Sequence, residues 1–188
     1  MNTSPDTRPP PSFVPWDIEI ARINFGANCG PASFAAITGK EVCRVMGHFL
    51  HFEHSRWTNL TQMLWAFAAA DYLTKVQKCI LPARGVALVQ WLGPWTQKDF
   101  FSRWSLPHTH WVAVEGNWIF DHTVGIWQTF TEWKHKTAPQ FILEIPKATG
   151  WAVKYGLNVT RASESGSRHG ETRQRLYQHR PSAQICIA

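Results

Sequence analysis

The first part of the chain has the apolar pattern of short helices. Residues 29–38 (CGPASFAAIT) begin with a Gly-Pro pair suited to a first turn, continue with alanines and precede a glycine that can end a helix. A short second helix is expected over 40–46. Asn59 and Gln62 fit a capping box in front of a third helix over 60–71, where apolar side chains recur on one face.

From residue 76 onward the pattern changes to short runs rich in β-branched and aromatic residues, which is typical of strands. We expect these strands at 76–81, 86–91, 110–115, 118–122 and 140–145. Helices followed by a run of strands indicate an α+β fold, with an antiparallel sheet packed against the helices.

The two ends of the chain differ in composition from the middle. Residues 1–13 are polar and rich in proline, which predicts a flexible arm. Residues 160–188 lack apolar periodicity and are predicted to form a disordered, polar and basic tail. The folded domain is then 14–159, a length sufficient for one domain with its own core.

The net charge of +6 could suggest nucleic acid as a partner. However, residues 161–188 hold five Arg and two Glu, so three of the six charges lie in the predicted tail. The middle of the chain has no basic run interleaved with aromatic residues. We therefore expect no nucleic-acid binding, and an acidic partner for the tail remains open.

The sequence also limits the cellular location. It has no apolar stretch of about 18 residues that could cross a membrane, and its beginning lacks the basic start and apolar segment of a signal peptide. Its four cysteines form no CxxC pair. These features predict no membrane partner and a place in the reducing cytosol, or delivery as an effector without a cleaved signal.

A histidine-rich stretch raises the question of a metal. His48, His51 and His54 follow Cys43 at spacings of about one helical turn. Neither CxxC nor HExxH accompanies them, so an aromatic-rich helix or loop is the better interpretation. We expect neither a metal nor another cofactor.

Cys29 stands apart from the other cysteines as a candidate nucleophile. A thiol reacts as its thiolate, and the N-terminus of a helix stabilises that charge. Cys29 lies where the first helix begins, directly before Gly30 and Pro31. Gly30 allows a substrate carbonyl to approach, and the Cys29 N–H is placed to bind an oxyanion.

A base and its partner are expected on one hairpin. His110 opens HWVAVEGNWIFD, two short strands that meet at Gly116-Asn117. A tight turn there pairs Val112 with Asp121, which leaves His110 one diagonal step from Asp121 on the same face of the sheet. Diagonal neighbours are about 7–8 Å apart at the backbone, within reach of an imidazole–carboxylate hydrogen bond. A three-residue loop would remove this contact.

The segment NCGPASFAAITG resembles the nucleophile helix of papain-fold cysteine peptidases, most of all the double-glycine leader peptidases of bacteriocin exporters. In that family Cys-Gly-Pro-Ala opens the helix, a His well downstream opens a strand, and an Asp follows on the next strand. Here 81 positions separate Cys29 from His110, and 11 separate His110 from Asp121. Over residues 20–145 the resemblance implies a papain-like fold, with N-terminal helices carrying the Cys and a sheet carrying His and Asp.

The resemblance implies a thiol hydrolase that cleaves a peptide or isopeptide-like amide through a Cys29 thioester. The family's oxyanion Gln, a few positions before the Cys, is replaced by Ile23, which leaves Asn24 and Asn28 as candidate donors. Two alternatives therefore stay open: an acyltransferase that uses the same thioester, and an inactive fold that serves as a protein-binding module.

Overall fold

A computed structural model describes residues 9–96 and 108–164. The helices are α1 (Ile18–Phe25), α2 (Cys29–Thr38), α3 (Val42–Val45), α4 (Phe52–Ser55), α5 (Leu60–Ala69), α6 (Phe130–Glu132) and α7 (Ala138–Glu144). The strands are β1 (Tyr72–Lys78), β2 (Arg84–Leu92), β3 (Thr109–Glu115), β4 (Trp118–Asp121), β5 (Ile126–Thr129) and β6 (Gly150–Arg161). A π-helical turn, η5 (Trp133–Thr137), joins α6 to α7, and single 3-10 turns are η1 (Met46–His48), η2 (Pro94–Thr96) and η6 (Ala162–Glu164).

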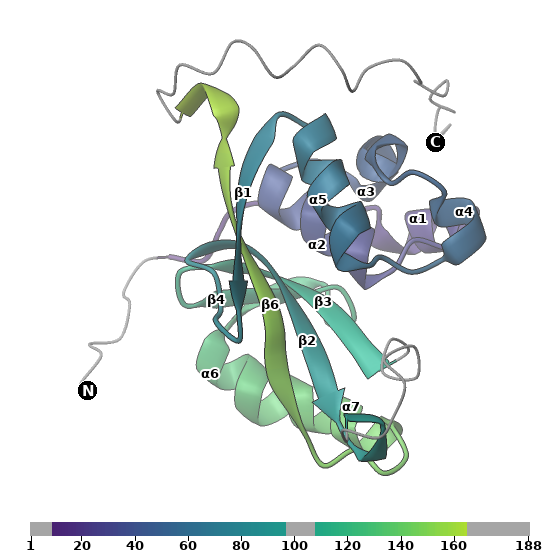
Figure 1. Cartoon of the computed structure of the whole chain (residues 1–188), viewed down its shortest axis with the longest axis vertical. Coiled ribbons are helices and arrows are strands. Elements are labelled where there is room, and N and C mark those ends of the chain that lie inside the picture. The colour runs from purple at the N-terminus through teal and green to yellow at the C-terminus, as the bar shows by residue number, and fades with distance from the viewer. Residues whose placement is uncertain (1–8, 97–107, 165–188) are drawn as a thin grey trace.

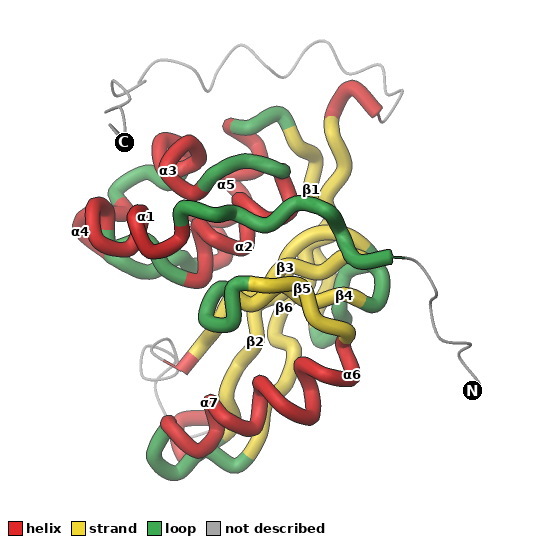
Figure 2. The backbone as a smooth tube through the Cα atoms, turned by 180° about the vertical axis from the view of Figure 1, so that it is seen from behind, coloured by secondary structure: helices red, strands yellow, loops and turns green. Residues whose placement is uncertain are grey.

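The sheet lies between two helical layers. Within the described residues its six strands are antiparallel, in the order β1-β6-β2-β3-β4-β5. Helices α1 to α5 lie on one side of it, and α6 and α7 lie on the other (Figures 1 and 2). Along β3, Trp111 and Ala113 join the core under α2, whereas Val112 and Val114 join the core under α7. The protein thus has an α+β fold with helices packed on an antiparallel sheet.

The expected helices are present. α2 occupies the expected range 29–38 and ends at Gly39, whose φ of 67° is one that glycine adopts without strain. α5 begins behind the expected capping box, in which Asn59 Oδ1 accepts from the Gln62 N–H and the Gln62 amide oxygen accepts from the Asn59 N–H. α3 occupies the middle of the helix expected over 40–46. Local sequence signals were sufficient for these three helices, whereas α1 in the same layer was not predicted.

The strands agree less well with the sequence pattern. β2, β3 and β4 match the strands expected at 86–91, 110–115 and 118–122. β1 begins earlier than the strand expected at 76–81, and it ends before Cys79, which adopts a left-handed φ of 58°. β5 and β6 were not predicted, although β6 lies between β1 and β2 in the middle of the sheet.

The strand predicted at 140–145 is wrong, because this segment belongs to α7. The helix starts at a capping box in which Thr129 Oγ1 accepts from the Glu132 N–H, and it continues through the π-helical turn. A short apolar run fits a buried helix as well as a strand, so periodicity alone could not decide between them.

The predicted arm and tail reach beyond the described residues. At the N-terminal side the carbonyl of Phe13 accepts a hydrogen bond of 2.7 Å from Trp127 Nε1. At the other end β6 continues to Arg161 and is followed by η6. Over the two described ranges, none of the helices has the length and apolar character that a bilayer crossing requires.

Candidate active site

Cys29 is the first residue of α2 and is partly buried. Asn28 caps the helix: its Oδ1 accepts from the Gly30 N–H at 3.3 Å and lies 4.0 Å from the Cys29 sulfur. The capping geometry directs the first backbone N–H groups of the helix toward the region in front of Cys29, where their partial positive charge favours an anion.

The packing of α2 on β3 positions Cys29. Ser33, one helical turn after Cys29, donates from its hydroxyl to the carbonyl of Trp111 at 3.0 Å. Residues four apart lie on the same face of a helix, so Cys29 lies on the face of α2 that packs on β3. The residue of β3 that precedes Trp111 is His110, and the Cys29 thiol lies close enough to its imidazole to raise the pKa of the ring.

The hairpin of β3 and β4 positions His110 and Asp121. Its register pairs Glu115 with Trp118 and Ala113 with Phe120, as expected for a tight turn. The predicted hydrogen bond is present: Asp121 Oδ1 lies 3.0 Å from His110 Nε2. Because Nε2 faces the carboxylate, Nδ1 is the ring nitrogen left for the thiol. The His110 imidazole thus has Asp121 as a hydrogen-bond partner and Cys29 as a neighbour.

Asp121 is fully buried and held by three donors. Besides His110, the Thr123 N–H donates to Oδ1 at 3.1 Å and Trp133 Nε1 donates to Oδ2 at 2.9 Å. Sequence reasoning missed Trp133, which is the first residue of the π-helical turn and also fully buried. Such turns occur frequently at functional sites, but no local sequence signal distinguished this tryptophan from the others.

The groups around His110 and Asp121 shift the pKa values of both side chains. Burial lowers the pKa of the His110 imidazole, but the charge and hydrogen bond of Asp121, together with the neighbouring Cys29, outweigh burial and raise it to about 10. Burial likewise raises the pKa of Asp121, but the His110 charge and the donors around the carboxylate hold it well below its ordinary value. The site therefore contains an imidazolium paired with a carboxylate at neutral pH.

The two candidate oxyanion donors lie in different surroundings. Asn24 is exposed on α1. Asn28 Nδ2 already donates to the carbonyl of Arg56 at 2.6 Å, while its Oδ1 caps α2. Asn28 is thus a structural cap in this conformation, with one amide proton engaged. Both remain predictions as oxyanion donors.

Three side chains with metal-ligand chemistry converge beside the thiol. One ligand atom each from His110, Asp121 and His122 lies within 4.8 Å of the others. Both Asp121 oxygens already accept hydrogen bonds, and a metal here would have to replace the bond between His110 and Asp121. The donor set thus fits the orientation of an imidazole better than it fits a metal.

Gly30 is required by the close packing of the loop before α5. A Cβ at this position would lie 2.2 Å from Thr58 Oγ1 and 2.5 Å from Thr58 Cβ. Trp111 Nε1 fixes the loop by donating to the Thr58 carbonyl at 2.7 Å. The loop cannot withdraw without breaking this bond.

We expect Gly30→Ala to lower the free energy of unfolding by about 1–3 kcal/mol, the usual cost of overpacking, as measured by urea denaturation. Thr58→Gly removes both atoms that the new Cβ would meet. In the Thr58→Gly background, Gly30→Ala should therefore lower the free energy of unfolding by less than it does in the natural protein. Equal losses from Gly30→Ala in both backgrounds would show that the contact with Thr58 is not the cause.

The comparisons with known proteins give little further information. No protein-family model matches the sequence, and no curated protein matches it. Among solved structures, the peptidase domain of Streptococcus ComA, a bi-functional ABC transporter involved in a quorum sensing pathway, is similar over 69% of this chain and 91% of that domain. The identity is 14% and the TM-score is 0.35, values too low to support an argument about this chain.

Proposed function

We propose that this protein is a papain-like thiol hydrolase that cleaves a peptide or isopeptide-like amide. The observation that carries the proposal is the hydrogen bond between Asp121 and His110, with Cys29 beside the imidazole at the start of a helix. A nucleophile, a base within hydrogen-bond reach and a third group that orients the base are the elements of covalent acyl transfer.

In the proposed reaction the Cys29 thiolate attacks the substrate carbonyl carbon. As the tetrahedral intermediate collapses, the carbon–nitrogen bond breaks and His110 Nδ1 gives its proton to the leaving amine. This leaves an acyl thioester on Cys29 and a neutral imidazole. Water then attacks the thioester carbon, His110 takes its proton, and the carbon–sulfur bond breaks to return the thiolate.

Asp121 would keep the imidazole in the productive orientation. Its hydrogen bond to Nε2 leaves Nδ1 directed at the thiol and stabilises the imidazolium form. The backbone N–H of Cys29, at the first helical position, has no acceptor within the helix and would bind the oxyanion. Asn24 or Asn28 would supply a second donor; Asn28 could do so with its remaining amide proton.

Two alternatives share this geometry. An acyltransferase would pass the same acyl group from Cys29 to an amine or thiol instead of water. A binding module would use the fold without turnover, and the engagement of Asn28 with Arg56 is the observation that favours it. The predicted basic tail at 160–188 would then provide a contact for an acidic partner.

The reaction class can be tested by mass spectrometry. We would incubate the full chain with a peptide library and with a competing amine, and would identify the products and any acyl adduct on Cys29. Free carboxyl termini that persist at high amine concentration support hydrolysis. Amide products in place of the free carboxyl termini support the acyltransferase. The binding module is supported if no product forms and a protein partner still binds to the Cys29→Ala and His110→Ala variants.

The proposal also includes a location. Cys29 and Cys79 are free thiols. Free thiols suit the cytosol or another reducing compartment.

A further inference from the structure

His122 directly follows β4 and lies beside the proposed base. Its ring centroid is 5.3 Å from that of His110, with the two planes at 38°. The ring of Trp91, from β2, lies 6.1 Å from His110 at 30°. The imidazole of His110 thus has aromatic neighbours from two other segments, and no step of the proposed reaction uses either one.

The polar atoms of His122 contribute little to its position. Nδ1 is buried and lies 3.7 Å from Asp121 Oδ1, which is beyond hydrogen-bond distance, and it has no hydrogen-bond partner within residues 9–96 and 108–164. The side chain is 22% exposed, whereas that of Asp121 is fully buried. His122 therefore borders the fully buried carboxylate and itself reaches the surface.

The charges that face His122 come from three elements. They are His110 on β3, Asp121 on β4 and Glu19 on α1. Burial, followed by the positive charge of His110, lowers the pKa of His122 to about 4 despite the two carboxylates. The ring is therefore neutral at physiological pH, beside an imidazole that is charged.

We infer that His122 is a positioning residue, a neutral ring that keeps water away from the hydrogen bond between His110 and Asp121 and holds the His110 ring against Cys29. This inference rests on the proposed function, since it concerns the same base. The hydrogen bond is stronger in a dry site, because water would otherwise compete for both the carboxylate and the imidazolium. The role needs the shape of the His122 ring, and it does not need the ring nitrogens.

A pair of substitutions separates the ring from its nitrogens. His122→Phe keeps a flat ring of similar size and removes the buried unpartnered nitrogen, so its urea midpoint should equal or exceed that of the natural protein. His122→Ala removes the ring and opens the carboxylate to water. The readouts are the iodoacetamide labelling rate of Cys29 at pH 6 and the exchange of the His110 Nε2 proton in histidine-labelled NMR spectra.

We expect His122→Phe to label Cys29 within about twofold of the natural rate, and His122→Ala to label it about tenfold more slowly, a part of the roughly 10²–10⁴ that a positioned base provides. Proton exchange at His110 should be faster in His122→Ala alone. Unchanged labelling and exchange in His122→Ala would overturn the inference. An equal loss of labelling rate in both variants would also overturn it. The ring nitrogens would then be needed, as they are in a proton carrier or a metal ligand. Slow labelling in the natural protein would instead contradict the proposed function.

Discussion

Cys29→Ala should remove turnover almost completely, to less than about one part in a thousand of the natural rate. The reason is chemical, since no thioester can form at this position without the sulfur. The substitution removes a single partly buried atom at a helix start, so the fold should persist. Product formation by mass spectrometry, at matched protein concentration and with an equal urea midpoint, is the measurement.

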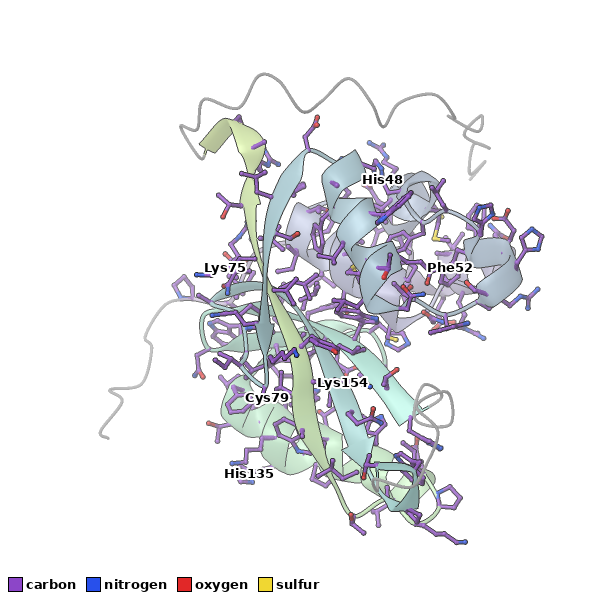
Figure 3. The ribbon with its side chains drawn as sticks, in the orientation of Figure 1. His48, Phe52, Lys75, Cys79, His135 and Lys154 are labelled. Carbon is purple, nitrogen blue, oxygen red and sulfur yellow. The ribbon has the colours of Figure 1, made fainter. Side chains whose placement is uncertain are left out.

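Cys79→Ser is the matched control for this experiment. Cys79 is an exposed free thiol at the end of β1, apart from α2 (Figure 3). Its replacement should leave turnover unchanged. Residual activity of Cys29→Ala above the stated limit, or an equal loss in Cys79→Ser, would contradict the role of Cys29.

Asp121→Ala should give the largest loss of stability. The substitution leaves the His110 imidazole and Trp133 Nε1 buried without an acceptor, in place of two hydrogen bonds to a carboxylate. Removal of one partner of a buried ion pair costs about 3–5 kcal/mol. Urea denaturation from pH 3 to pH 9 would measure this difference in the free energy of unfolding.

The pH dependence of that loss follows from the two pKa shifts. The pKa of Asp121 is depressed in the folded protein, so its stabilisation is present above the ordinary value of 3.8 and decreases as the pH falls below it. The pKa of His110 is raised, so its stabilisation is complete below 6.5 and is lost as the pH rises toward about 10. The difference between the natural protein and Asp121→Ala should therefore be largest between 3.8 and 6.5.

An exposed pair serves as the control for the buried one. Lys136 Nζ lies 3.3 Å from Glu132 Oε1, and both side chains face solvent. Lys136→Gln should not change the urea midpoint measurably, because water replaces the interaction. A loss from Asp121→Ala that does not vary with pH would indicate lost packing instead of a lost ion pair.

The parts of the site that the sequence predicted depend on local signals. The start of α2 follows from Gly30 and Pro31 after Cys29, and the contact of His110 with Asp121 follows from one tight turn at Gly116-Asn117. Each requires only neighbouring residues and the two-residue period of a strand. The side-chain contact between Cys29 and His110 was expected from the family resemblance alone.

The parts that the sequence did not predict depend on tertiary packing. β6 begins at Gly150 and pairs with two strands that precede it by many residues, and no local pattern selects those partners. Trp133 reaches Asp121 because the π-helical turn places it on the face of the sheet that α6 and α7 cover. The ring of His122 lies against that of His110 on the same hairpin, a contact that the sequence pattern did not single out.

The most direct test is the rate of Cys29 alkylation by iodoacetamide against pH, in the natural protein and in His110→Ala. Mass spectrometry assigns the label, and the exposed Cys79 in the same sample serves as the internal reference. The proposed site predicts fast labelling of Cys29 that persists well below pH 7 and is lost in His110→Ala, while Cys79 is unaffected. An imidazole-activated thiolate would be contradicted if labelling of Cys29 rose only near the ordinary thiol pKa of about 8.5 and did so equally in both proteins.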